Sequence, residues 1–235
     1  MTVRCLPRWE MAAVTGAVVV VDVLRAFTTA AYAFAAGAAE IWPVGDVEHA
    51  LAFKRARPDA LAMGEEHGRQ VPGFDLSNSP VEVFAADLAG RTIVQRTSAG
   101  TRGVLAATGA TRLWCASLVC ASATAAAVDA CGLGAPTYVI TGRFPDGPAD
   151  GGEDDLVTAI FIDALRRGEP VDRDDVVRAV RESREAEITL AIGKGHVHPD
   201  DVAYATDIDR FDFAMEVDRT TDGFRLTAVR GAVGN

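Results

Sequence analysis

Polar residues that could bind an anion and a metal ion are grouped at four places along this chain of 235 residues. The four places are Asp22 with Arg25, Thr28 and Thr29; residues 64–68 with 73–80; residues 96–102; and residues 142–155. Each follows a stretch of apolar residues, and the first follows a run of four valines, which is typical of a strand buried on both faces. Ligands of open α/β sheets bind beyond the carboxyl ends of the strands. We therefore expect the four places to meet at one edge of a sheet.

The segment 96–102 has the composition of an anion-binding loop. It places two arginines, a glycine and three hydroxyl side chains at the predicted start of a helix, namely Arg96, Thr97, Ser98, Gly100, Thr101 and Arg102. Free backbone N–H groups at the start of a helix attract an oxyanion, and Arg adds bidentate hydrogen bonds. We expect this segment to bind an anionic substrate group, with Arg25 and Arg143 as further clamps.

Carboxylates at the same places suggest a metal ion. Asp22, Glu65, Glu153 and Asp154 offer hard oxygen ligands, which Mg²⁺ takes while keeping waters and a phosphate. The chain has 23 Lys and Arg against 33 Asp and Glu, so a cation would help it bind an anion. Simpler roles exist, because Asp22 could cap the next helix and residues 153–155 could favour a helix dipole. Together with the anion-binding loop, the carboxylates indicate Mg²⁺-assisted phosphate chemistry.

Alternating strand and helix patterns must position these residues. The sequence predicts strands over 17–21, 40–44, 60–63, 92–95, 112–115 and 137–141, and helices over 25–36, 47–57, 100–108, 121–130 and 154–167, with a short helix from Pro80. Serial βα units predict an α/β fold with a mostly parallel sheet and helices on both faces. Residues 171–206 have a charged helical pattern, and residues 211–229 predict a C-terminal β-hairpin. One domain over 1–235 is expected, with possible lobes 1–90 and 91–235.

Several other classes of protein are excluded by what the sequence lacks. A nucleic-acid-binding protein normally has a basic face, whereas this chain has a formal net charge of −10 and no Lys/Arg run. The apolar stretch 26–39 is too short to span a bilayer, and residues 1–11 lack a signal-peptide core, so we expect a cytoplasmic protein without a membrane partner. No Cys-x-x-Cys pair, P-loop, dinucleotide-binding fingerprint or Gly-x-Ser-x-Gly elbow is present.

The same motifs resemble those of the 2-phosphosulfolactate phosphatase (ComB) family. The similarity runs in order from about residue 17 to 217 and is carried by Asp22-Val23-Leu24-Arg25-Ala26 with Thr28-Thr29, Gly64-Glu65, Gly73-Phe74-Asp75-Leu76-Ser77-Asn78-Ser79-Pro80, Thr97-Ser98-Ala99-Gly100-Thr101-Arg102, Gly142-Arg143-Phe144 and Glu153-Asp154. It implies a ComB-like fold and Mg²⁺-dependent hydrolysis of 2-phospho-3-sulfolactate to 3-sulfolactate and phosphate, a step in coenzyme M biosynthesis.

The chemistry of the motif residues and the family resemblance together give each of them an expected role. Asp22, Arg25, Asp75, Arg102 and Arg143 are expected to be catalytic, with Asp75 or the metal activating the attacking water. Thr28, Asn78 and the loop 96–101 are expected to contact the substrate. A covalent aspartyl intermediate on Asp22 is an open alternative, because a carboxylate at a strand end also suits that chemistry.

The chain departs from the family pattern at positions that bear on the substrate. Glu66 replaces the usual Arg, Ala99 replaces Asn, Ser77 replaces Gly, and the loop before Glu153 is longer. We expect Glu66 to pair with Arg96, an extra charge where the family has an uncharged residue. Two other functions stay open: a phosphatase for another small phosphorylated hydroxyacid, and a non-catalytic anion-binding protein with a decayed site. A homodimer is also possible.

Overall fold

A ten-stranded sheet forms the centre of the molecule, which we describe from a computed structural model over residues 3–143 and 151–231. Its strands, in chain order, are β1 (Arg4–Pro7), β2 (Ala17–Val21), β3 (Glu40–Val44), β4 (Leu61–Glu66), β5 (Arg69–Gln70), β6 (Thr92–Arg96), β7 (Arg112–Ala116), β8 (Thr137–Ile140), β9 (Phe213–Thr220) and β10 (Gly223–Arg230). Their order across the sheet is β1-β8-β2-β7-β9-β10-β3-β6-β4-β5.

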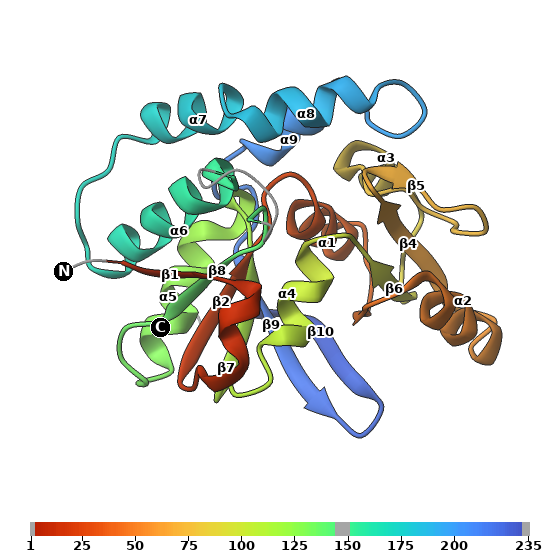
Figure 1. Cartoon of the computed structure of the whole chain (residues 1–235), viewed down its shortest axis with the longest axis horizontal. Coiled ribbons are helices and arrows are strands. Elements are labelled where there is room, and N and C mark those ends of the chain that lie inside the picture. Colours follow the sequence, from red (N-terminus) through yellow and green to blue (C-terminus); the bar gives the residue numbers. More distant parts are fainter. Residues whose placement is uncertain (1–2, 144–150, 232–235) are drawn as a thin grey trace.

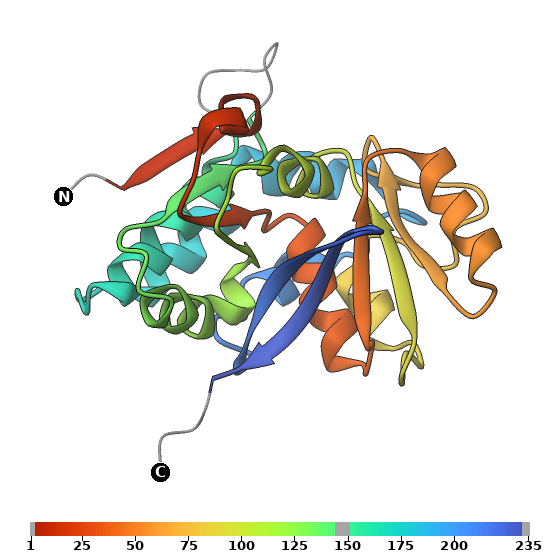
Figure 2. The same ribbon diagram turned by 90° about the horizontal axis from the view of Figure 1, so that it is seen from below.

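The sheet consists of two parallel halves joined by the C-terminal hairpin. Strands β1, β8, β2 and β7 pair in parallel in one half, and β3, β6 and β4 pair in parallel in the other. The hairpin β9–β10 pairs antiparallel with β7 on one side and with β3 on the other. It runs obliquely between the two sets of strands (Figure 2), and β10 pairs with β3 where Leu226 lies opposite Ile41.

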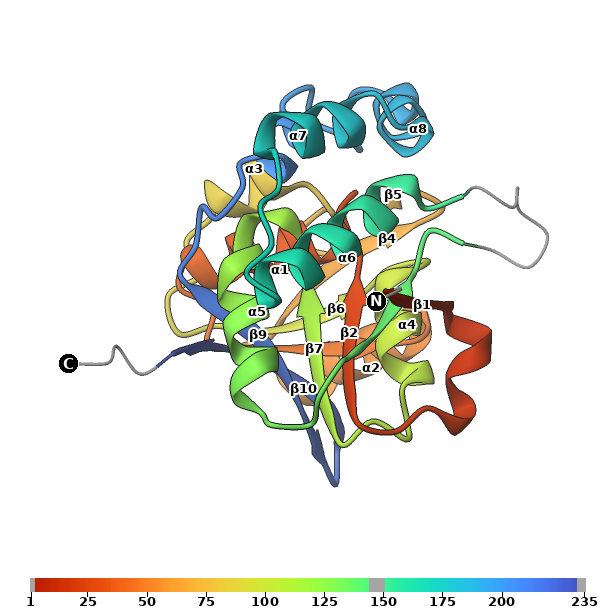
Figure 3. The same cartoon turned by 90° about the vertical axis from the view of Figure 1, so that its left-hand side faces the viewer.

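Helices cover both halves. They are α1 (Ala26–Ala35), α2 (Val47–Ala56), α3 (Pro80–Phe84), α4 (Gly100–Ala106), α5 (Ala121–Ala130), α6 (Glu153–Arg166), α7 (Arg173–Arg181), α8 (Arg184–Ile192) and α9 (Asp201–Ala205), with 3-10 turns η1 (Arg8–Ala13) and η2 (Leu118–Cys120). Helices α1 and α4 lie between the two halves, α5 and α6 cover the outer face of the first, and α2 covers the second (Figure 1). Helices α7 and α8 form a layer across the carboxyl end of the first half (Figure 3).

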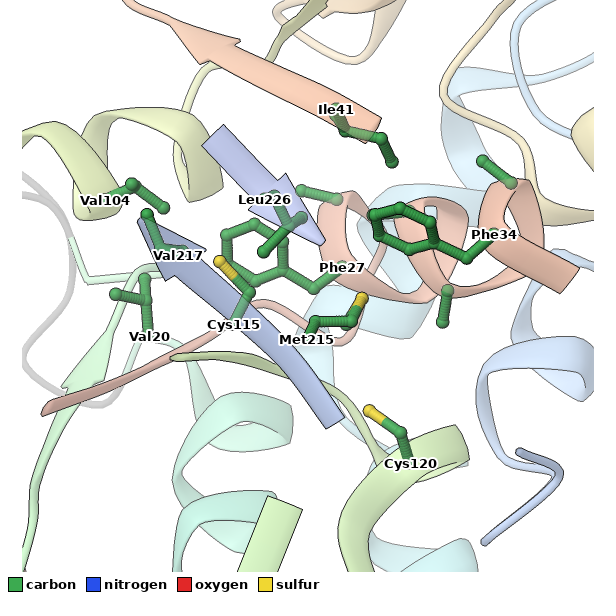
Figure 4. Packing of buried hydrophobic residues seen from close by; sticks show 14 of the residues in the cluster. Val20, Phe27, Phe34, Ile41, Val104, Cys115, Cys120, Met215, Val217 and Leu226 are labelled. Carbon is green, nitrogen blue, oxygen red and sulfur yellow. The ribbon is translucent and has the colours of Figure 1, made fainter. Parts of the chain in front are cut away.

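The largest hydrophobic cluster lies where the hairpin meets both halves (Figure 4). Met215, Val217 and Leu226 of the hairpin are buried in the same cluster as Val20 of β2 and Ile41 of β3. Phe27 of α1 is fully buried in this cluster. Burying a side chain of this size contributes about 1.5–3 kcal/mol, so the hairpin holds the two halves together through shared apolar contacts.

The predicted α/β fold with a mostly parallel sheet and a C-terminal hairpin is confirmed. Asp46 and Ser79 cap α2 and α3, since their side chains accept hydrogen bonds from the N–H groups of His49 and Glu82. A division into lobes at residue 90 does not match the sheet, because each half takes strands from both 1–90 and 91–235.

Three parts of the prediction differ from the structure. Strand β1 and turn η1 form in a segment for which we predicted no element, and β5 lies in a predicted loop. The stretch 171–206 is three short helices. Its breaks fall at Ser183, which caps α8 by accepting from the N–H of Ala186, and at Gly193, whose positive φ ends α8.

Candidate functional site

A cavity of about 620 Å³ lies where the carboxyl ends of β2, β4, β6 and β8 come together. The described residues that line it include six carboxylates and five arginines: Asp22, Glu65, Glu66, Asp154, Asp155 and Glu185, with Arg8, Arg25, Arg96, Arg102 and Arg184. The four places chosen from the sequence therefore meet. They do not meet at the edge of one continuous parallel sheet, because the antiparallel hairpin reverses the direction of one half. The obliquely running hairpin instead turns the two halves toward a shared cavity.

Asp22, at the carboxyl end of β2, is buried at the base of this cavity. Its Oδ1 accepts from the N–H of Ala26 at 2.8 Å, and its Oδ2 accepts from Thr141 Oγ1 at 3.1 Å. Burial, reinforced by the charge of Glu65, raises the pKa of Asp22 to about 6. A Cβ added at Gly100 would lie only 2.7 Å from Asp22 Oδ2, so a glycine at the start of α4 leaves the space that this carboxylate occupies.

Two further carboxylates enter the cavity from the first turn of α6. Asp155 accepts from the N–H groups of Val23 and Gly142, both at 2.9 Å, and so ties the loop after β2 to the loop after β8. Asp154 has a buried Oδ1 with no hydrogen-bond partner in the described part of the chain. Burial and nearby acids, Glu185 foremost, raise the pKa of Asp154 well above its ordinary range. Asp154 thus offers a buried, unpaired oxygen that a proton or a cation would satisfy.

The arrangement of these carboxylates is compatible with a magnesium ion bound by two of them. Within residues 3–143 and 151–231, no three His, Cys, Asp or Glu side chains are grouped closely enough to hold a metal ion. Mg²⁺ commonly uses only one or two carboxylates, completing its octahedron with waters and substrate phosphate. Asp22 and Asp154 fit that requirement, because the charge of Asp22 helps to raise the pKa of Asp154 and Asp154 Oδ1 lacks a partner among the described residues.

The loop after β6 is closed largely by its own hydrogen bonds and by Glu65. Thr97 and Thr101 each donate a backbone N–H to the other's hydroxyl. Glu65 accepts from the N–H and the hydroxyl of Ser98 and from the N–H of Gly68. Both oxygens of Glu65 are therefore bonded within the protein, and a metal ion held by Glu65 would share them with these hydrogen bonds.

Arginines supply the positive charge of the cavity. Arg25 is buried, and its Nη1 forms an ion pair with Asp201 at 2.9 Å. Arg102 is exposed and has no ion-pair or hydrogen-bond partner among the residues that the structure describes. Burial, together with the charge of Arg102, lowers the pKa of Arg8, whose Nη1 donates to the carbonyls of Thr141 and Arg143. Both arginines line the cavity, where guanidinium groups suit an anion.

Other predicted residues of the site fall into two sets. Asn78, Thr97, Ser98 and Arg96 line the cavity, and the buried Oδ1 of Asn78 has no partner in the described part of the chain. Gly100 and Thr101 are buried and are not among the lining residues. Arg143 is half-buried and is not among the lining residues, and the segment 144–150 that follows it lies outside the described residues.

Three predicted roles do not fit the positions of the residues. Asp75 lies away from the cavity, where its carboxylate accepts from the N–H of Ala62 and from Lys54. Thr28 is buried in the core, with its hydroxyl bonded to Val23 O and Ser117 Oγ. Glu153 is exposed on the first turn of α6, where the helix turns its side chain away from the cavity. Asp155, two residues later, takes the inward position expected for Glu153.

The sequence interpretation missed several residues of the lining. Asp155, Glu185, Arg184 and Arg8 were not singled out, although Asp155 adjoins a predicted ligand. Arg184 and Glu185 come from α8, and Glu185 accepts from the N–H of Gly152 at 2.8 Å. No local motif marks these residues, because they reach the cavity only through the packing of α8 over the sheet edge.

The predicted pairing of Glu66 with Arg96 is confirmed. Arg96 Nη2 lies 3.0 Å from Glu66 Oε1, and Arg96 Nη1 donates to the carbonyl of Glu65 at 2.6 Å. Arg96 is buried and Glu66 is half exposed at the cavity rim. The pair therefore neutralises a carboxylate that would otherwise repel an anionic substrate.

We expect Glu66→Arg to weaken turnover of an anionic substrate, because the new guanidinium would face Arg96 at about 3–4 Å and displace it. Adding Arg96→Thr should restore part of the activity. Kinetics of the two single variants and the double variant measure the coupling, which should exceed about 0.5 kcal/mol. Additive effects would contradict the pairing.

Comparisons with known proteins show which proteins this chain is similar to. A family model described as 2-phosphosulpholactate phosphatase matches residues 7–220. The chain is 31% identical over 200 residues to a probable 2-phosphosulfolactate phosphatase of Bacillus subtilis, covering 85% of this chain and 86% of that protein. It is 40% identical over 169 residues to a protein of the same name from Thermus thermophilus, covering 70% and 69%. A third, from Thermoplasma acidophilum, is 32% identical over 164 residues, covering 70% and 71%.

No helix within the described ranges is long and apolar enough to cross a membrane.

Proposed function

Since this chain belongs to the 2-phosphosulpholactate phosphatase family, we propose that it is a Mg²⁺-dependent phosphatase that converts 2-phospho-3-sulfolactate into 3-sulfolactate and phosphate. The observation that carries the proposal is the cavity, in which the buried carboxylates of Asp22 and Asp154 lie beside a group of arginines. Carboxylates and arginines in one cavity suit a dianionic phosphate bound together with a cation.

The arginines of the cavity would bind the anionic groups of the substrate. Arg102 and Arg8, which both line the cavity, suit a phosphate or sulfonate through charge-assisted hydrogen bonds. Asn78 Oδ1 is a buried acceptor without a partner in the described part of the chain, so it suits a bound water or the hydroxyl of the 3-sulfolactate product. These contacts orient the phosphoryl group and stabilise the charge that develops on its oxygens.

Asp22 and Asp154 would hold the Mg²⁺ ion. When bound, the ion would polarise the phosphoryl oxygens and lower the pKa of a bound water. Glu185 offers a general base, because its Oε2 is buried at the cavity and has no partner among the described residues. That oxygen suits a base that accepts the proton of the attacking water. The water oxygen then bonds to phosphorus, the ester P–O bond breaks, and the sulfolactate oxygen leaves and takes the proton that Glu185 accepted.

A screen of phosphorylated hydroxyacids for phosphate release, with Mg²⁺ and with excess EDTA, tests the proposal. We expect release from 2-phosphosulfolactate with Mg²⁺ and loss of at least about a hundredfold in EDTA, because the buried acids would then have no cation. Faster phosphate release from phospholactate or phosphoglycerate would identify that compound as the substrate in place of 2-phosphosulfolactate. Release that is undiminished in EDTA would contradict the Mg²⁺ dependence, and no release at all would favour an anion-binding protein.

The aspartyl-intermediate mechanism is tested separately. Rapid acid quenching followed by mass spectrometry of the intact chain would show an added phosphoryl group on Asp22 during turnover. We expect none, because the bound cation and the hydrogen bonds from Ala26 and Thr141 would together occupy the oxygens of Asp22. Detection of phosphorylated Asp22 would replace direct water attack with the two-step route.

A further inference from the structure

We propose that Asp201 is a positioning residue that fixes the Arg25 guanidinium for phosphoryl transfer, an inference that rests on the proposed function. Asp201 begins α9, far along the chain from the cavity motifs, and is absent from the described residues of the cavity lining. Nothing in the motifs singles it out. Its side chain nevertheless has no exposed surface and carries a charge, so the fold keeps an ionisable group buried there.

Every oxygen of the Asp201 carboxylate has a partner. Oδ2 lies 2.9 Å from Arg25 Nη1 and accepts from the N–H of His198 at 3.0 Å. Oδ1 accepts from Ser79 Oγ at 2.6 Å. Ser79 directly follows Asn78, whose buried Oδ1 is at the cavity. One carboxylate therefore fixes two cavity segments, Arg25 directly and Asn78 through its neighbour in the chain.

Arg25 is held by more than this ion pair. Its Nη1 also donates to the carbonyl of His196 at 3.1 Å, and its Nη2 donates to the carbonyl of Gly68 at 3.4 Å. Within the described residues its Nε has no partner. The planar guanidinium is thus fixed through both Nη atoms, and its positive charge acts on Asp22 to favour the ionised carboxylate. A guanidinium fixed before the substrate arrives needs no reorganisation during the reaction.

A buried ion pair is weak evidence for stability, because its desolvation cost rivals the attraction between the charges. The convergence of Ser79, His198 and Arg25 on one carboxylate is better explained by the orientation that it gives to Arg25. The consequence is specific. Loss of the Asp201 charge should lower kcat more than it raises KM, because misorientation of a clamp by about 1 Å costs about a hundredfold in rate.

The test compares Asp201→Asn with Asp200→Asn in the full-length chain, using the substrate found in the phosphate-release screen. Asp200 is the exposed neighbour of Asp201 and is the matched control. We expect kcat per folded protein to fall by about 10–100-fold in Asp201→Asn, with KM changed less than about threefold, and no change in Asp200→Asn. In an Arg25→Gln background, Asp201→Asn should cause little further loss, because the two residues act as a unit.

Two outcomes overturn the inference: unchanged kcat in Asp201→Asn, or losses that multiply independently with those of Arg25→Gln. If Asp201→Asn does not fold, Asp201→Glu keeps the charge but moves it by one methylene, and a normal kcat in that variant would also contradict the proposal. Failure of the proposed function is distinguishable, because the wild-type chain would then release no phosphate.

Discussion

Asp22→Asn should abolish phosphate release while making the metal-free protein more stable near neutral pH. The amide can keep both hydrogen bonds of Asp22, accepting from the N–H of Ala26 and donating to Thr141 Oγ1, so the local structure survives. It cannot supply the negative charge that a cation requires. We expect kcat/KM to fall by about a thousandfold or more.

The stability change follows from the raised pKa of Asp22. Because this pKa is about 6 in the folded chain against an ordinary value of 3.8, the folded state holds the proton more tightly than the unfolded state. Stability of the wild type in EDTA therefore decreases as the pH rises from about 4 to about 6, and stays lower above that window. The Asn variant lacks this ionisation and should gain up to about 3 kcal/mol near pH 7.

Thermal unfolding and phosphate release measured on the same preparations check both effects. Asp75→Asn is the matched control, because Asp75 is paired with Lys54 away from the cavity and should keep its kcat. Full activity of Asp22→Asn would remove Asp22 from the reaction. If Asp22→Asn is less stable than the wild type in EDTA, the ionised carboxylate of Asp22 does not destabilise the folded chain as expected.

Arg102→Ala should lower kcat/KM roughly 10–150-fold. This corresponds to a loss of about 1.5–3 kcal/mol of transition-state stabilisation, because a charge-assisted hydrogen bond to the phosphate or sulfonate is lost. The side chain has no partner among the described residues, so its removal breaks no other contact there and stability should change by less than about 0.5 kcal/mol. Steady-state kinetics and competitive inhibition by inorganic phosphate measure the loss.

Arg230→Ala is the control for the change in net charge. Arg230 is exposed, is paired with Asp212 on the surface and lies outside the described cavity lining. We expect it to alter neither kcat/KM nor inhibition by phosphate. If Arg102→Ala matches Arg230→Ala in both measurements, the anion binds at another part of the cavity.

The fold was predictable where one element carries its own pattern. The valine run before Asp22 is buried on both faces as a parallel strand, and Asp46 and Ser79 cap the helices that they precede. The position of the hairpin was not predictable, because strand order depends on contacts between Leu226 and Ile41, residues far apart in the chain. Strand β1 was also missed, since Arg4–Pro7 has little apolar alternation and is held by pairing with β8.

The site was predictable to the level of its loops and less so at single residues. Asp22, Arg25 and Asp154 line the cavity as expected, because each follows a strand or begins a helix beside the predicted sheet edge. Asp75 and Glu153 have suitable chemistry but point elsewhere. Side-chain direction is set by packing, which a motif does not record, and for the same reason Glu185 and Asp201 were missed.

The hairpin at the centre of the sheet also sets the order in which the molecule can assemble during synthesis. Every strand of both parallel halves is translated before Phe213, the first residue of β9, leaves the ribosome. Until then β7 and β3 each have an unpaired edge, and the apolar cluster that Met215 and Leu226 complete stays open. A nascent chain with open strand edges is prone to wrong pairing. Synthesis of β9 and β10 therefore closes the sheet and brings the two walls of the cavity together.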